Sequence, residues 1–238
     1  IDSGTLLYWT KGFSARGVVG EDVVRLLKEA LRRKGVYNVD VAALVNDTVG
    51  TFAALAYEDV SCDMGVIIGT GTNACYFEKS KGMVINIEWG NFKGFRKTSY
   101  DRTLDRRSSN AGEQALEKMV SGMYLGEIVR IVIKEIAKKD TLRGFRTEDM
   151  SAIEASLSKG EAVLKKICGL VSTRAARIAA ASIAAVITKM DPDLSTAHTV
   201  AIDGSVFEKH PTFSRKMRAA LKEIFGRHAS HIRIKLTK

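Results

Sequence analysis

Proline and cysteine are scarce in this chain of 238 residues, which holds two prolines and three cysteines. With prolines only at Pro192 and Pro211, no proline-rich linker marks a boundary between domains. The cysteines, Cys62, Cys75 and Cys168, are widely spaced and form no C-x-x-C pair. This pattern gives no sign of a disulfide framework and favours a reducing compartment with ordinary buried or surface thiols.

Histidines are also few, and long apolar runs are missing. The four histidines lie far apart, without the spacing of metal ligands, so we assign no metal site to them. No uninterrupted apolar run reaches the roughly 18 residues of a membrane span. The most apolar stretch, 178–187, is alanine-rich and flanked by Arg177 and Lys189. This stretch predicts a buried helix, and nothing indicates a membrane anchor.

The chain opens at Ile1 without a methionine, a basic segment or the apolar core of a signal peptide. We therefore expect the start of the protein to be missing from this sequence. The cysteine usage predicts a cytoplasmic protein, and an organellar targeting signal ahead of Ile1 stays an open alternative.

The net charge of +10 is compatible with an anionic partner such as nucleic acid, an acidic membrane or a charged substrate. The basic residues do not form one tract, however. Some end predicted helices, as at 32–34 and 138–139, where cations suit the helix macrodipole. Others alternate with acids over 101–107. This distribution favours solvated helical surfaces over a nucleic-acid-binding stripe.

Alternating strands and helices predict an α/β fold. The expected helices cover 21–34, 48–57, 112–139 with a break near Gly122, 161–190 with a break near Gly169 left open, and 212–225. The expected strands cover 39–45, 64–68, 74–78, 83–88, 199–202 and 232–236. The apolar run at 39–45 is typical of a strand buried on both faces. The turn at 69–73 is expected to join two antiparallel strands.

Polar residues follow several of these strands, which is where α/β folds place ligands. Asp47 follows the first predicted strand, beside Asn46. A carboxylate there is a candidate base for a substrate hydroxyl, as in kinases, although an N-cap of the next helix is the simpler role. The Gly69–Thr70–Gly71–Thr72 turn suits phosphate, because its glycines permit close backbone approach; a plain hairpin turn is the alternative.

Three further segments are weaker candidates. Glu88 ends a strand and is suited to accept hydrogen bonds from sugar hydroxyls, or it is simply exposed beside a buried Trp89. The segment 203–205 is either a turn or a second phosphate or magnesium contact. Lys11 is either a surface lysine or a point charge that stabilises a transferring phosphoryl group.

Six stretches, in order, resemble the eukaryotic-type hexokinase and glucokinase family of the actin-like ATPase superfamily. They are W-T-K-G-F at 9–13, L-V-N-D-T-V-G-T at 44–51, G-T-G-T-N-A-C-Y at 69–76, N-I-E-W-G at 86–90, E-K-M-V-S-G-M-Y-L-G-E at 117–127 and D-G-S-V-F-E-K-H-P at 203–211. The resemblance implies a mixed sheet flanked by helices in a ribonuclease H-like, two-lobed fold. Residues 1–45 would end the small lobe, which is incomplete, and residues 46–238 would form most of the large lobe.

The resemblance also implies ATP-dependent phosphorylation of the 6-hydroxyl of a hexose, most simply glucose, with Mg²⁺ on the ATP phosphates. The positions that match the family's sugar site are Thr10, Lys11, Asn46, Asp47, Asn73, Glu88 and Glu117. Asp47 matches the general base, and Lys11 would assist the phosphoryl group. The nucleotide site is matched by Gly69, Thr70, Gly71 and Thr72, and by Asp203, Gly204 and Ser205.

The chain departs from the family pattern in places. The family's first phosphate loop would precede Ile1 and its glycine-rich adenosine loop would follow Lys238, while the stretches 78–83 and 144–161 are short. Two other classes therefore stay open: a hexose sensor that binds sugar without turning it over, and a basic nucleic-acid-binding module. The second has only the net charge in its favour.

Overall fold

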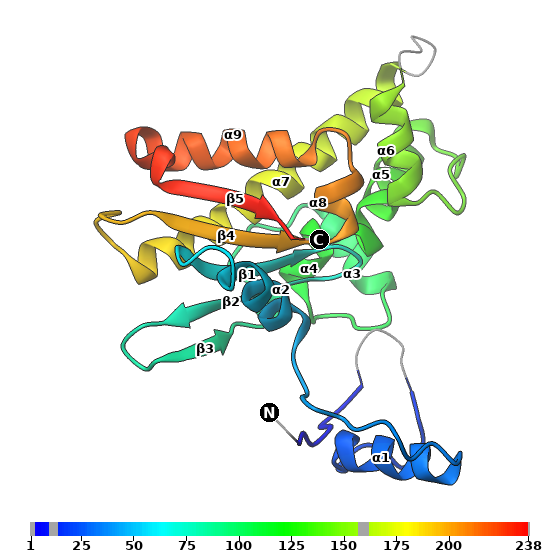
Figure 1. The fold of residues 1–238 in the computed structure, drawn as a ribbon. Helices are drawn as coiled ribbons and strands as arrows, with labels where there is room; N and C mark the ends of the chain where they lie inside the picture. The colour runs from blue at the N-terminus through cyan, green and yellow to red at the C-terminus, as the bar shows by residue number, and fades with distance from the viewer. Residues whose placement is uncertain (1–2, 10–13, 157–161, 238) are drawn as a thin grey trace. The chain divides into compact units, whose positions relative to one another are not determined.

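The computed structural model describes residues 3–9, 14–156 and 162–237, and its chain divides into two compact units, Ile1–Asn46 and Asp47–Lys238 (Figure 1). The described part of the first unit contains the helix α1 (Val23–Arg33), which confirms the helix predicted over 21–34. Asp22 begins this helix, because its carboxylate accepts hydrogen bonds from the backbone N–H groups of Val24 and Gly4, each at 3.0 Å.

The strand predicted over 39–45 is wrong. These residues form neither helix nor strand, and the side chains of Val39 and Val45 are 55% and 53% exposed. A strand needs neighbours to pair with, and the described residues of the first unit offer only the isolated bridge between Thr5 and Asp22. An apolar run alone does not supply such a partner.

The second unit is built on a five-stranded sheet with the order β3-β2-β1-β4-β5. The strands are β1 (Cys62–Ile68), β2 (Thr72–Glu78), β3 (Met83–Asn86), β4 (His198–Asp203) and β5 (Ile232–Leu236). β1, β2 and β3 pair antiparallel, whereas β4 and β5 pair parallel to β1. The sheet is therefore mixed, and it confirms the other five predicted strands and the antiparallel turn.

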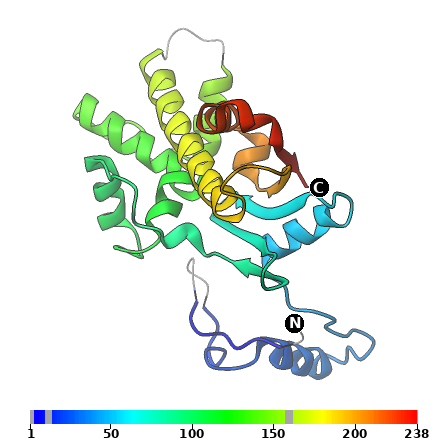
Figure 2. The same cartoon turned by 90° about the vertical axis from the view of Figure 1, so that its left-hand side faces the viewer.

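Helices cover both faces of this sheet (Figures 1 and 2). They are α2 (Asp47–Ala56), α3 (Ser99–Arg107), α4 (Ala115–Val120), α5 (Gly122–Ala137), α6 (Thr147–Ala155), α7 (Ala162–Met190), α8 (Ser205–Lys209) and α9 (Phe213–Phe225), with short 3₁₀ turns at Trp89–Asn91 and Gly226–His231. On one face α2 packs through Leu55 against Cys62 and Ala201. On the other face α4, α5, α7 and α9 bury the main hydrophobic core with β1 and β4.

The long helix α7 lies in that core and continues through Gly169 without interruption. By length and composition it is able to span a membrane, and it is the one such helix among the described residues. The sequence analysis did not identify this helix as long and apolar enough to span a membrane, because polar residues interrupt its apolar runs. Residues such as Ala176, Ile183 and Ile187 are fully buried against neighbouring helices, so packing in the core explains its apolar composition and confirms the buried helix predicted at 178–187.

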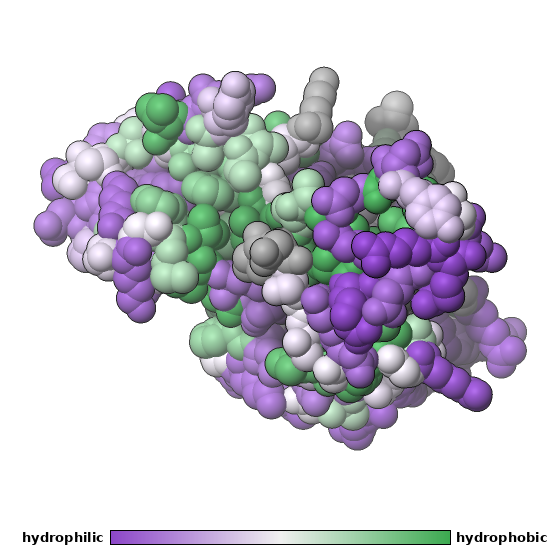
Figure 3. Space-filling view, turned by 60° about the horizontal axis from the view of Figure 1, so that its bottom comes forward, coloured by the Kyte–Doolittle hydropathy of each residue, from purple (hydrophilic) through white to green (hydrophobic). Residues whose placement is uncertain are grey.

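Charged residues on the helices are largely engaged with neighbours on the surface. Arg25 on α1 contacts Glu29 on the same helix and Glu21 just before it, and Arg177 pairs with Glu223 at 2.7 Å. In the space-filling view hydrophilic and hydrophobic residues are interspersed (Figure 3). This arrangement agrees with the solvated helical surfaces expected from the sequence.

A buried histidine joins the start of β4 to β1. The side chain of His198 is 1% exposed; its Nδ1 lies 2.6 Å from Asp63 and its Nε2 lies 3.2 Å from Asp191. The hydrogen bond to Asp63, more than the charge of Asp191, raises the pKa of His198 above its usual value despite burial. A carboxylate beside each ring nitrogen therefore favours the charged form of the imidazole.

We expect the protein to lose stability as the pH rises past neutrality. Because the pKa of His198 is higher in the folded state, its contribution is complete below about pH 6.5 and disappears as the pH rises through the folded-state pKa. The measurement is urea unfolding of the wild type and His198→Gln between pH 5 and 9. The control is His228→Gln, since His228 has no carboxylate partner among the described residues. An equal pH dependence in all three proteins would contradict the assignment.

Candidate functional site

The candidate site lies at one edge of the sheet in the second unit, where β1, β3, β4 and β5 end and β2 begins. Ile68 at the end of β1 pairs with Thr72 at the start of β2, and Ile67 pairs with Asp203 at the end of β4. Asn86 at the end of β3 pairs with Cys75 on β2. The register therefore brings the predicted segments 69–73, 86–88 and 203–205 to the same edge.

Residues 69–72, called the glycine turn here, are anchored through their carbonyl groups. The carbonyl of Gly69 accepts from the N–H of Gly122 at 2.7 Å, and the carbonyl of Thr70 accepts from the N–H of Met123 at 3.3 Å. In contrast, no acceptor among the described residues takes the N–H of Thr70 or Gly71. Two backbone donors therefore remain available for an anion, as a phosphate requires.

The segment 203–205 packs directly on the glycine turn. Gly204 has φ +120°, and a Cβ there would lie 2.5 Å from the backbone of Ile68 and 2.7 Å from the nitrogen of Gly69. Only glycine fits this conformation and this approach. The segment is a junction between strand and helix, since Asp203 ends β4 and Ser205 begins α8. The structure thus brings both predicted nucleotide segments together.

Asn73 and Glu88 form a polar cluster with Asn86. The amide of Asn73 donates to the carboxylate of Glu88 at 2.7 Å and to the side chain of Asn86 at 2.9 Å. Asn86 donates to the same Glu88 oxygen at 2.8 Å. Glu88 is exposed and has a left-handed backbone conformation with φ 53°. The cluster presents both donors and acceptors, which is what recognition of sugar hydroxyls needs.

Asn86 was not among the predicted site residues, although it lies in the N-I-E-W-G stretch. Sequence spacing does not show that its side chain bridges Asn73 and Glu88, because that contact depends on the pairing of β2 with β3. Trp89 is buried, as expected beside an exposed Glu88, and its indole N–H donates to the hydroxyl of Thr72 at 3.1 Å.

Glu117 lies on α4, below the glycine turn. Its side chain is 4% exposed, and one carboxylate oxygen accepts from the backbone N–H of Thr72 at 3.0 Å. Glu117 therefore supports the end of the glycine turn by binding Thr72, the residue directly before Asn73. This contact connects the predicted sugar residues with the predicted nucleotide residues.

Asp47 is the first residue of α2 rather than the residue before it, so the helix begins one position earlier than expected. Its carboxylate is exposed and accepts from the N–H of Thr48 at 2.9 Å. The thiol of Cys75 donates to the carbonyl of Thr48 at 3.2 Å. Burial raises the pKa of that thiol, and the charge of Asp47 raises it further. Asp47 is therefore close to Cys75 on β2, and Cys75 is two residues after Asn73 in that strand.

The remaining predicted residues are not placed in this cluster. Thr10 and Lys11 lie outside the described residues. Asn46 is exposed and is the last residue of the first unit. Among the described residues, no group of three or more histidine, cysteine, aspartate or glutamate side chains is arranged to hold a metal ion.

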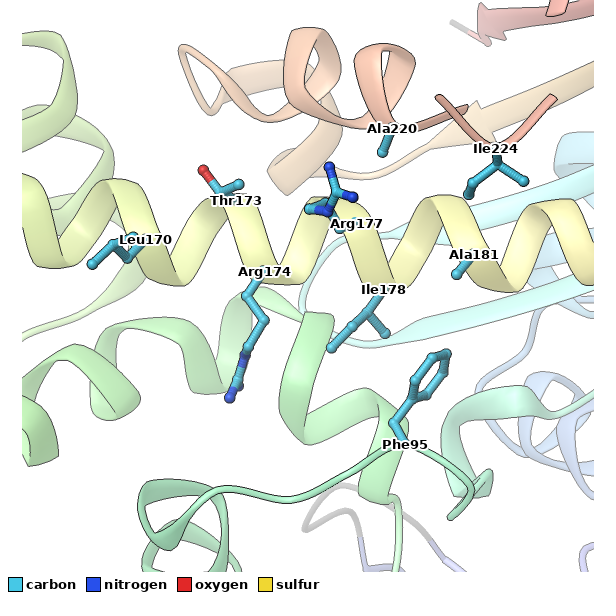
Figure 4. A pocket seen from close by; sticks show the side chains of 9 residues that line it. All are labelled: Phe95, Leu170, Thr173, Arg174, Arg177, Ile178, Ala181, Ala220 and Ile224. Atoms are coloured by element: carbon cyan, nitrogen blue, oxygen red, sulfur yellow. The ribbon is translucent and has the colours of Figure 1, made fainter. Parts of the chain in front are cut away.

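A groove with a volume of about 540 Å³ lies elsewhere, along α7. Figure 4 shows Ile178 and Ala181 on α7, with Phe95 on one side and Ala220 and Ile224 of α9 on the other. None of the predicted site residues lines this groove. The groove is therefore separate from the candidate site.

The family models and the known proteins that match this chain are all hexokinases in the comparisons given below. Two family models, both described as hexokinase, match residues 63–238 and 1–57. Human hexokinase-1 is 41% identical over 272 residues, which covers 94% of this chain and 30% of that protein. Human hexokinase-2 is 36% identical with the same coverage. Since these alignments are longer than the chain, the relatives have residues without a counterpart here.

Solved structures agree in fold. A hexokinase from Schistosoma mansoni complexed with glucose is 33% identical and superposes with a TM-score of 0.86, covering 99% of this chain and 63% of that one. Another hexokinase crystal structure is 31% identical with a TM-score of 0.82, covering 100% of this chain and 61% of that one. These likenesses confirm the actin-like ATPase fold. The chain spans about 30% of the length of the curated relatives it matches.

Proposed function

The chain belongs to the hexokinase family, and on this basis we propose that the protein transfers a phosphoryl group from ATP to the 6-hydroxyl of glucose or a related hexose. One observation carries the proposal. The five residues 69–73 combine a turn with two available N–H groups and an asparagine that belongs to a polar cluster. A site for phosphate and a site for hydroxyl groups therefore adjoin within one short segment.

The hexose would be held by Asn73, Glu88 and Glu117, with Asn86 completing the cluster. Asp47 would take the proton of the attacking 6-hydroxyl, because it is an exposed carboxylate close to β2 and is accessible to a substrate. By the family resemblance, Thr10, Lys11 and Asn46 match further sugar-binding positions, and we assign Thr10 and Lys11 to the small lobe on the sequence alone. Closure of the lobes would exclude water as a competing acceptor.

The described residues fit a nucleotide at the glycine turn. Thr70 and Gly71 would donate to phosphate oxygens, and Gly204 would allow close approach of the 203–205 segment. Magnesium, when bound to ATP, would neutralise charge on the phosphates. Mg²⁺ commonly uses one or two carboxylates together with substrate phosphates, so the absence of a larger acidic cluster among the described residues does not conflict with it. Asp203, an exposed carboxylate at the end of β4, lies in the segment that packs on this turn.

The test is sugar-dependent release of ADP by the full-length protein, with glucose, fructose and mannose in turn. We expect release that depends on hexose and on Mg²⁺. Glucose binding in calorimetry without ADP release would contradict the proposed reaction and leave a hexose sensor as the function. A protein that binds no hexose at all would exclude both the hexokinase function and the hexose-sensor function.

A further inference from the structure

The junction between α4 and α5 holds the glycine turn at both ends. At one end, Gly122 and Met123 donate to the carbonyls of Gly69 and Thr70 at 2.7 and 3.3 Å. The first N–H groups of a helix have no partner within the helix, and here two of them are used on the turn. At the other end, Glu117 accepts from the N–H of Thr72 at 3.0 Å.

Most of this segment, residues 117–123, is buried: residues 117–121 are buried, Gly122 is half-buried and Met123 is exposed. Glu117 and Thr72 are each 4% exposed, and Ser121 between the two helices is fully buried. The N–H of Ser121 donates to the carbonyl of Glu117 at 2.9 Å, which closes α4 immediately before α5 begins. One short piece of chain therefore fixes the peptide groups on both sides of the Thr70 and Gly71 N–H donors.

Gly122 is the tightest point of the contact. A Cβ at this position would lie 3.1 Å from the carbonyl oxygen of Gly69 and 2.8 Å from a methyl group of Val206. Val206 belongs to α8, directly after the 203–205 segment. A side chain at position 122 would thus push on both predicted nucleotide segments at once.

We propose that the 117–123 segment, and Gly122 above all, positions the phosphate-binding N–H groups of Thr70 and Gly71. With both neighbouring carbonyls fixed on α5, the turn keeps its free donors facing away from that helix. Because Glu117 is also a proposed hexose ligand, this segment links the hexose site to the phosphate site, and any coupling of the two ligands through it acts equally in both directions. The proposal deepens the proposed hexokinase function and rests on it.

The test compares Gly122→Ala with the wild type in the full-length protein. We expect the dissociation constant for ADP and the KM for ATP to rise about tenfold, the loss expected when one well-placed hydrogen bond is disturbed. The affinity for glucose measured by calorimetry without nucleotide is expected to stay within about twofold. In Gly122→Ala, glucose is expected to change the dissociation constant for ADP much less than it does in the wild type.

Gly169→Ala is the matched control, because Gly169 lies within α7 and an added Cβ there meets no atom within 4 Å. If Gly122→Ala does not fold, Met123→Pro removes one donor at a position in the first helical turn, where proline is tolerated. Wild-type protein that binds no glucose would defeat the proposed function itself. Wild-type protein that binds both ligands, with folded variants that bind ADP normally, would overturn only the positioning role.

Discussion

Replacing Asp47 with alanine is expected to lower kcat for hexose phosphorylation by about 10² or more, since a general base typically supplies at least that factor. The carboxylate is exposed at the start of α2, so its removal does not disturb the core. The measurement is steady-state ADP release under saturating glucose and ATP. Glucose affinity is to be measured separately, because Asp47 is also a proposed sugar ligand.

Asp47→Asn separates catalysis from helix capping. An asparagine oxygen still accepts from the N–H of Thr48, so the local bond at 2.9 Å is preserved while the base is lost. Asp47→Ala and Asp47→Asn are therefore both expected to have a strongly lowered kcat. Asp193→Ala serves as the control, because Asp193 is an exposed aspartate just before β4, at the opposite edge of the sheet. Near-normal turnover by Asp47→Asn would leave Asp47 with only a structural role.

The elements that sequence analysis predicted best are those with strong local signals. α1 has a capping aspartate, apolar periodicity and a following glycine, and β5 has the alternation of a half-buried strand. The exposed segment 39–45 was mistaken for a strand because an apolar run does not reveal whether a pairing partner exists. α3 was not predicted, although Thr98 and Asp101 form a capping box that is visible in the sequence.

The candidate site was predictable in its parts but not in its connections. Motif resemblance supplied Asn73, Glu88 and Glu117. The hydrogen bond from Thr72 to Glu117 spans 45 residues, and those from Gly122 and Met123 reach back to the glycine turn over similar separations. Such contacts follow from how α4 and α5 pack on the sheet, and no local pattern encodes them. The bridging role of Asn86 was missed for the same reason.

The largest effect on stability is expected at Glu154, on α6. Its side chain is 5% exposed and accepts hydrogen bonds from Ser172 at 2.6 Å, Thr212 at 2.7 Å and Lys216 at 2.9 Å, with His210 at 3.4 Å. Although burial raises the pKa of this carboxyl, these contacts together lower it to about 2. One carboxylate therefore joins α6 to α7 and to the start of α9.

Glu154→Ala is expected to lower the free energy of unfolding by about 3–5 kcal/mol, because it leaves the Lys216 ammonium without its buried carboxylate and the Thr212 hydroxyl without its acceptor. Urea unfolding at pH 7 measures this loss. Glu148→Ala, on the same helix, is the control: Glu148 and its partner Arg146 are 77% and 75% exposed, so the loss should stay below about 1 kcal/mol.

The effect of Glu154 should also depend on pH in a defined direction. Because the pKa is lower in the folded state, the carboxylate stabilises the protein fully above its unfolded-state pKa, and this stabilisation disappears as the pH falls through about 2. The difference between wild type and Glu154→Gln is therefore expected to be larger at pH 7 than at pH 3. A difference that is the same at both values, or a cost no larger than that of Glu148→Ala, would show that the carboxylate charge does not hold α6, α7 and α9 together.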